Sequence, residues 1–315
     1  MPYWRTPATI RAAVEAVLNQ TYPDLMLYVV NDGDRREAPW TVLADIDDPR
    51  LVRVDLPENR GRYFADAAVL AAVSTPWFAI HDADDVAEPE WLEWLLAAAD
   101  REGWDACFAP QTVVAVDGTA RREEVGSLLP VRRLRHIAHH AAVYRTQALR
   151  DVGGPHPAFR IGYDTLIVNL LTLRHHCGAI DRPVYTRYLR PGSLTTAPET
   201  ASGSPARRAA RRELQRLYAL AWLTGPRTAI TPTIGEELSA EVATAANLIA
   251  AAREETPSFP KMFWTWRATV WGLMTSVVAI SRFSACRAAV FGFVLAVTPN
   301  RCQFSGSMAH DTWLR

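Results

Sequence analysis

Apolar positions in the first hundred residues follow two different periods. Ile10, Val14, Val17 and Leu18 recur at helical spacing, after a Thr6-Pro7 pair that is typical of a helix start. Residues 25–30 form a short continuous apolar run, which favours a buried strand. The same criteria predict strands at 51–56 and 77–80 and helices at 61–73 and from residue 88 onward. This alternation predicts an α/β fold, a mostly parallel sheet flanked by helices.

The pattern is less regular beyond residue 100. It predicts strands at 104–110, 111–116 and 141–144, an edge strand at 183–188, a basic irregular segment at 121–135, and helices at 164–173, 206–223 and 235–253. Residue 183 is a proline, which cannot donate to a ladder, and this is why an edge position is expected.

Two acidic turns follow predicted strands. Asn31-Asp32 comes after the strand at 25–30, and His81-Asp82-Ala83-Asp84-Asp85 comes after the strand at 77–80. Ligands of such sheets bind at the carboxyl ends of the strands. If the extended geometry continues, Asp82 and Asp84 lie on one side, where Mg²⁺ or Mn²⁺ relieves their repulsion. Because Mg²⁺ completes its shell with phosphate and water, a phosphate-bearing ligand is expected; an Asp-rich turn with Asp85 as a cap is the alternative.

Composition excludes several classes of protein. The chain has 34 basic and 34 acidic residues, so no general attraction to nucleic acid is expected. Its four cysteines are scattered without a CxxC pair, which argues against a zinc site and fits a reducing, cytoplasmic compartment. No apolar leader segment follows Met1.

Four motifs together resemble the family 2 glycosyltransferases. They are Asn19-Gln20-Thr21-Tyr22-Pro23, Val29-Val30-Asn31-Asp32-Gly33, Pro57-Glu58-Asn59-Arg60-Gly61 and Asp82-Ala83-Asp84-Asp85. Their order and spacing match over about residues 2–225. The resemblance implies a GT-A fold and inverting, metal-dependent sugar transfer from a nucleoside diphosphate donor, usually UDP, to a hydroxyl or amine acceptor that the sequence does not identify.

The resemblance also implies roles for individual residues. The donor nucleotide is expected to contact Pro2, Tyr3, Asp32, Arg62, Asp82, Ala83 and Asp84. Asp32 would hydrogen-bond the base, Asp82 would lie near the ribose, and Asp84 would bind the metal ion. A structural Asx turn is the alternative for Asp32, and a solvated position at a helix start is the alternative for Arg62.

The catalytic base is expected at a helix start after a glycine loop. In Arg160-Ile161-Gly162-Tyr163-Asp164 this position is Asp164, and a helix N-cap is the alternative role. Tyr163 stands where the family commonly has a first acid, so acceptor contacts there are in question. His139 and His140 are candidates for the acceptor side, with a purely structural role as the alternative. The segment 187–196 is expected to close over the donor.

The sequence predicts that the chain is divided into three parts. Residues 1–225 form the glycosyltransferase domain, 226–255 a C-terminal helix, and 256–315 an apolar and basic tail. Apolar stretches in the tail are too short to span a membrane, so peripheral attachment to the inner membrane face is one expectation. The family's first strand is matched only at its end, by Met1 to Trp4. We therefore expect an upstream start and a gap in the centre of the sheet.

Two other functions stay open from the sequence. A nucleotidyltransferase normally has a glycine-rich phosphate loop with a lysine, whereas this chain has one lysine, Lys261. A non-catalytic sugar-nucleotide-binding or scaffold protein is the second alternative, and Tyr163 favours it weakly.

Overall fold

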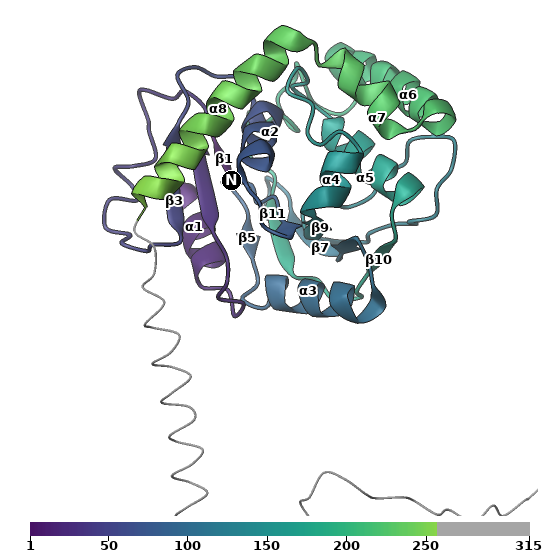
Figure 1. The fold of residues 1–315 in the computed structure, drawn as a ribbon. Coiled ribbons are helices and arrows are strands. Elements are labelled where there is room, and N and C mark those ends of the chain that lie inside the picture. Colours follow the sequence, from purple (N-terminus) through teal and green to yellow (C-terminus); the bar gives the residue numbers. More distant parts are fainter. Residues whose placement is uncertain (257–315) are drawn as a thin grey trace, which may run out of the picture. The chain divides into compact units, whose positions relative to one another are not determined.

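Three small sheets with helices around them make up residues 1–256, the part of the chain that this computed structural model describes (Figure 1). The helices are α1 (Ile10–Leu18), α2 (Arg62–Ala72), α3 (Trp91–Glu102), α4 (Thr146–Asp151), α5 (Tyr163–Arg174), α6 (Pro205–Thr224), α7 (Pro226–Ile230) and α8 (Glu236–Glu255), with a 3-10 turn at Thr231–Thr233. The strands are β1 (Pro2–Tyr3), β2 (Leu27–Asn31), β3 (Leu51–Asp55), β4 (Trp77–Phe78), β5 (Val86–Ala87), β6 (Ala106–Phe108), β7 (Gln111–Val114), β8 (Ala120–Glu123), β9 (Ala142–Arg145), β10 (Cys177–Ala179) and β11 (Tyr185–Tyr188).

The first sheet is parallel throughout, in the order β1-β2-β3. Tyr3 pairs with Asn31, and Asn31 pairs with Asp55, so the carboxyl ends of the three strands lie at one edge. The strand–helix alternation over the first hundred residues and the α/β class are therefore confirmed.

The other two sheets mix directions. One has the order β10-β6-β9-β4, with only β10 and β6 parallel, and the other has the order β5-β11-β7-β8, with only β11 and β7 parallel. Over the described residues, four strand pairs are parallel and four antiparallel, so the sheet content is less parallel than expected. The irregular pattern beyond residue 100 corresponds to this mixed part.

The sheet is interrupted between β1 and β4, as expected. β1 contributes two residues beside β2, and β4 belongs to a different sheet. A cavity of about 230 Å³ lies at this place, lined by β2, β4 and their covering helices, with Met1, Tyr28, Trp77 and Trp91 among its walls. The α-ammonium of Met1 donates to the carbonyl of Tyr28 at 2.8 Å.

The helices beyond residue 225 pack on the rest of the unit. Helix α8 crosses α2 and contacts β3 (Figure 1), and it buries Ala245, Ala246 and Ile249. Helix α7 packs on α6. Residues 226–255 therefore lie within the same compact unit as residues 1–225.

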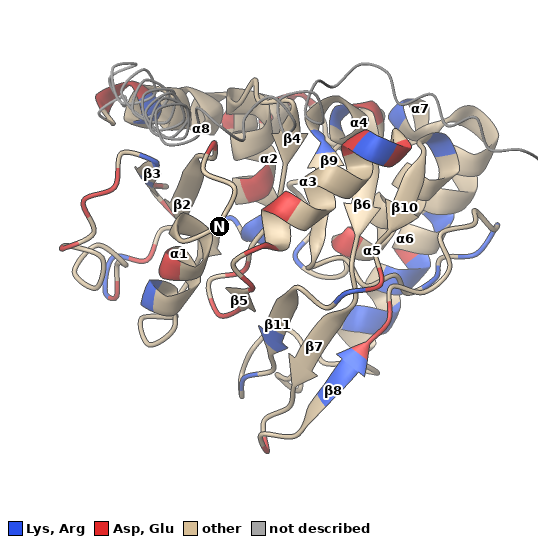
Figure 2. Ribbon diagram, turned by 90° about the horizontal axis from the view of Figure 1, so that it is seen from below, with Lys and Arg blue, Asp and Glu red and all other residues tan. Residues whose placement is uncertain are grey.

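Two local expectations were wrong, and two short elements were not predicted. β11 is an interior strand between β5 and β7, because Pro183 lies two residues before the strand starts and so removes no ladder donor. The segment expected to be irregular contains β8, which pairs with β7 after the Asp117-Gly118 turn and carries exposed arginines (Figure 2). β10 and α7 were not foreseen, since each is too short to show a period.

No described helix is both long and apolar enough to cross a lipid bilayer. The expected apolar and basic tail at 256–315, and the membrane attachment inferred from it, lie outside the described residues except for Thr256.

Candidate functional site

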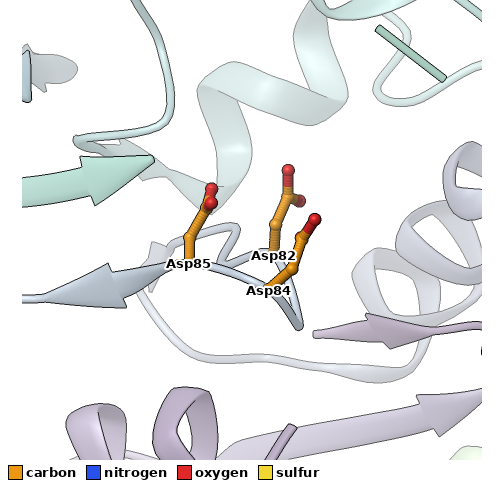
Figure 3. Close-up of side chains that lie close together, drawn as sticks. All are labelled: Asp82, Asp84 and Asp85. Atoms are coloured by element: carbon orange, nitrogen blue, oxygen red, sulfur yellow. The ribbon is translucent and has the colours of Figure 1, made fainter. Parts of the chain in front are cut away.

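The acidic turn after β4 brings three carboxylates together. The strand ends at Phe78, and the N–H of Asp85 donates to the carbonyl of Asp82 at 3.3 Å, which closes a turn. The expected continuation of extended geometry is therefore wrong, but the side chains of Asp82, Asp84 and Asp85 still point to one side (Figure 3). One oxygen from each lies within 4.8 Å of the others.

An arginine and a histidine lie beside Asp82. A guanidinium nitrogen of Arg62 lies 2.9 Å from one of its oxygens, and Nε2 of His140 lies 3.8 Å from the other. Burial disfavours the charged carboxylate, but attraction to the guanidinium of Arg62 outweighs it, so the pKa of Asp82 is lowered. Arg62 is thus not a solvated helix-start residue, because its side chain is 19% exposed and bound to Asp82.

Asp84 and Asp85 are less well compensated. Arg190 contacts Oδ2 of Asp84 at 2.6 Å, yet burial and repulsion from Asp82 raise the pKa of Asp84. Asp85 accepts the N–H of Tyr188 at 2.9 Å, and its other oxygen is buried without a hydrogen-bond partner. Burial and the charges of Asp82 and Asp84 raise the pKa of Asp85 to about 8.

This cluster fits a hard divalent cation. Carboxylate oxygens are the ligands that Mg²⁺ and Mn²⁺ prefer, and three of them converge here. An added positive charge would compensate the repulsion that raises the pKa values of Asp84 and Asp85, and the unpartnered oxygen of Asp85 is a free ligand atom.

The turn after β2 is built differently. The two oxygens of Asp32 accept the N–H groups of Arg60 and Gly61, each at 2.8 Å. Asp32 is 2% exposed, and burial raises its pKa despite these bonds. The side chain therefore ties the end of β2 to the segment before α2, which is a structural role but not the local Asx turn that the sequence left open. Contact with a base stays a prediction.

Two other expected donor contacts are buried. Tyr3 has no exposed surface, and its hydroxyl donates to the carbonyl of Glu37. Ala83 is 4% exposed, and its carbonyl accepts the hydroxyl of Thr9 at 2.9 Å. Both side chains are thus buried, and contact of either residue with a nucleotide stays a prediction. Pro2 is half-buried in β1.

Asp164 lies in the first turn of α5. Gly162 precedes it with φ +76°, a conformation that a residue with a Cβ adopts only under strain. Oδ1 of Asp164 accepts the N–H of Thr165 at 2.7 Å, and Oδ2 lies 3.4 Å from Nε2 of His139. Burial opposes the charge, but His139 and Arg62 attract it more strongly, so the pKa of Asp164 lies well below its usual value.

His139 and His140 stack on each other, with ring centroids 4.3 Å apart. Burial, followed by the neighbouring His139, holds the pKa of His140 well below its usual value, so its imidazole is neutral. Both rings line one cavity of about 20 Å³ together with Arg62, Asp82 and Asp164. The structure thus brings together five residues that the sequence assigned to separate roles.

Tyr163 does not belong to this group. It is fully buried and packs against Tyr63, His156 and Phe159. Its side chain points into the core, and the acceptor contact that the sequence left in question stays a prediction.

Sequence reasoning missed two charged residues near the cavity. Asp66, whose pKa burial raises to about 6, lies one helical turn after Arg62, at 3.9 Å. The i,i+4 spacing of these residues could have indicated the contact. Arg190 lies in the segment 187–196 that was expected to close over the donor, but its bond to Asp84 had no signal in the sequence.

The sequence is similar to those of known proteins. Residues 1–163, more than half of the chain, match the family described as Glycosyl transferase family 2. The succinoglycan biosynthesis protein ExoO of Rhizobium meliloti is 28% identical over 59% of this chain and 59% of its own length. A glucosyl-dolichyl phosphate glucuronosyltransferase of Haloferax volcanii is 36% identical over 35% of each chain. The chain thus spans about three fifths or less of the curated relatives it matches.

The fold has a counterpart among solved structures. Residues 1–349 of TarS from S. aureus, in complex with UDP-GlcNAc, superimpose with a TM-score of 0.57 at 17% identity, over 81% of this chain and 80% of that one. The UDP complex of the same protein gives a TM-score of 0.52. This likeness supports the GT-A fold, and together with the match over residues 1–163 it shows that the chain belongs to the family 2 glycosyltransferases.

Proposed function

We propose that this protein transfers a sugar from a nucleoside diphosphate, with uridine as the base, to an acceptor hydroxyl or amine, with inversion at the anomeric carbon and with Mg²⁺ or Mn²⁺ as cofactor. The observation that carries this proposal is the cavity shared by Asp82 and Asp164. In this cavity Asp82, from the acidic turn that fits a metal ion, lies beside Asp164, an ionised carboxylate at the start of α5. The TarS complexes with UDP and UDP-GlcNAc support the choice of donor.

The acidic turn would hold the donor diphosphate. Asp84 is the carboxylate that would bind the ion, with the unpartnered oxygen of Asp85 beside it, and the bound ion would neutralise the charge of the leaving diphosphate. Arg62 stays paired with Asp82, which fixes the direction of that carboxylate. Asp32 keeps the loop before α2 in place through its bonds to the N–H groups of Arg60 and Gly61.

Asp164 would act as the general base. Its lowered pKa keeps the carboxylate ionised at neutral pH, so its oxygens are free of a proton, although the same shift makes it a weaker base than an ordinary aspartate. The acceptor oxygen forms a bond to the anomeric carbon, the bond from that carbon to the diphosphate oxygen breaks, and the acceptor proton passes to Asp164. His139 holds Oδ2 of Asp164 and so orients the base, which makes it a positioning residue.

An assay without acceptor separates this function from its alternatives. The full chain is incubated with UDP-sugars and Mn²⁺, and released UDP is measured. Slow release that disappears in Asp84→Asn is the expected result. Binding of UDP-sugars without any turnover, with or without added acceptors, would instead support a sugar-nucleotide-binding protein. No binding of any sugar nucleotide would contradict the proposal.

A further inference from the structure

The carboxylate assigned to the metal ion already has a cationic partner. Nε and a terminal nitrogen of Arg190 both lie 2.6 Å from Oδ2 of Asp84. Arg190 comes from the segment after β11, more than a hundred positions along the chain from Asp84. The side chains of Asp84 and Arg190 are 18% and 33% exposed, so the contact lies at the mouth of the site.

The guanidinium of Arg190 compensates the negative charge of the acidic turn. Asp84 lies in a cluster with Asp82 and Asp85, whose charges raise its free energy when it is ionised. Arg62 forms its salt bridge with Asp82. Among the described residues, Arg190 is the one salt-bridge partner of Asp84. A guanidinium and a divalent ion on the same carboxylate oxygen would repel each other strongly.

The segment that carries Arg190 is held mainly by its own bonds. The carbonyl of Arg190 accepts the hydroxyl of Thr196, and the N–H of Ser193 donates to that hydroxyl at 3.1 Å. Arg187 donates to the hydroxyl of Thr195 at 3.0 Å. Because Arg190 is one-third exposed, its guanidinium can leave Asp84 for solvent or for an anion without unpacking the core.

We propose that Arg190 competes with the metal ion for Asp84, and that the donor diphosphate relieves this competition by accepting the guanidinium. This inference rests on the proposed function. It makes metal binding weak in the absence of donor and couples the two ligands, because a donor that takes Arg190 away from Asp84 strengthens metal binding, and the reverse holds by linkage.

Binding of Mn²⁺ to the full chain without donor tests the competition. The fraction of free Mn²⁺ is measured by electron paramagnetic resonance. We expect Arg190→Gln to bind Mn²⁺ at least about threefold more tightly than the wild type. In the wild type the metal-free protein is stabilised by the partly exposed ion pair between Arg190 and Asp84, which Mn²⁺ has to break, and the variant lacks this ion pair. Arg190→Lys keeps the charge and should stay close to the wild type.

Arg187→Gln is the matched control. This substitution removes one positive charge from the same segment, and that charge also acts on Asp82 and Asp85. It breaks no bond to Asp84, because Arg187 donates to Thr195. Its Mn²⁺ affinity should rise clearly less than that of Arg190→Gln, because only the long-range repulsion of the ion is reduced. Addition of UDP should strengthen Mn²⁺ binding in the wild type more than in Arg190→Gln.

The outcomes separate the two proposals. Equal Mn²⁺ affinity in Arg190→Gln and the wild type, or an equal gain in Arg187→Gln, overturns the competition while the proposed function stands. Absence of Mn²⁺ binding in every variant, with UDP present, contradicts both.

Discussion

The two acidic turns of this protein have similar sequences and different chemistry. In the turn after β2, Asp32 accepts two backbone N–H groups, and Asp34 accepts those of Arg36 and Glu37 at 3.0 and 3.1 Å. In the turn after β4, the partners of Asp82 and Asp84 are the side chains of arginines.

Backbone donors are part of the fold and cannot leave without local unfolding, whereas a side-chain cation can be exchanged for another cation. The difference teaches that an acidic cluster at a strand end is not in itself evidence of a ligand site. The first turn stabilises the loop before α2, and the second is the one that can take up an ion.

The largest effect is expected at Asp164, the proposed base, which shares a cavity with Asp82 of the second turn. Asp164→Asn should lower kcat by about 10²- to 10⁴-fold, because the acceptor proton loses its carboxylate. Affinity for UDP should stay unchanged, since the proposal assigns Asp164 to the acceptor and not to the nucleotide. Steady-state rates and calorimetry measure the two quantities. Asp100→Asn, an exposed position on α3, is the control. A fall in kcat of less than about tenfold would contradict the role of Asp164.

The next effect tests the structural nature of the first turn. Gly33 has φ +75°, and a Cβ there would lie 2.3 Å from the carbonyl carbon of Glu58. Gly33→Ala should lower the free energy of unfolding by about 3 kcal/mol or more, since backbone must move. Gly118 has a similar φ of +84° and open space around a Cβ, so Gly118→Ala should cost only about 1 kcal/mol. Urea unfolding compares them, and equal losses would contradict the close packing at Gly33.

A smaller effect concerns Asp66, which lies behind Asp82. Burial raises its pKa from 3.8 to about 6, so the folded state binds this proton more tightly than the unfolded state. Stability is therefore lost as pH rises from about 4 to 6 and does not return above that range. Asp66→Asn should remove this loss, a relative gain of up to about 3 kcal/mol at pH 7.

Unfolding free energies measured at pH 4.5 and pH 7 test the Asp66 prediction. The gain from Asp66→Asn should be larger at pH 7. The exposed Asp24→Asn variant serves as the control and should show the same small change at both values. A gain that does not depend on pH would show that Asp66 is already ionised at pH 4.5.

Much of the fold could be predicted from local periods. The helices α1 and α3 and the strands β2 and β3 have apolar patterns that fix which face is buried. The strand β8 has no such pattern, since exposed arginines on a solvent-facing edge need only a partner strand and a turn. The position of β8 therefore depends on its pairing with β7, and a local sequence pattern does not show which strands pair.

The site was predictable in its residues and less so in their partners. Asp82, Asp84 and Asp164 were found from motifs, and the structure places them near one another. The contact of Arg190 with Asp84 joins segments far apart in sequence, so it depends on the packing of β11 beside β5. The sequence left the contacts of Tyr163 in question, because it does not show which way the first residue of α5 points.

The most direct measurement is the affinity for UDP with Mn²⁺ and with EDTA, by calorimetry, in the wild type, Asp84→Asn and Asp34→Asn. Asn at position 34 keeps an oxygen that can accept the two N–H groups of its turn, so this variant is matched to the first turn. If the turn after β4 holds the ion, Mn²⁺ strengthens UDP binding in the wild type and in Asp34→Asn but not in Asp84→Asn. An undiminished effect of Mn²⁺ in Asp84→Asn would contradict the account.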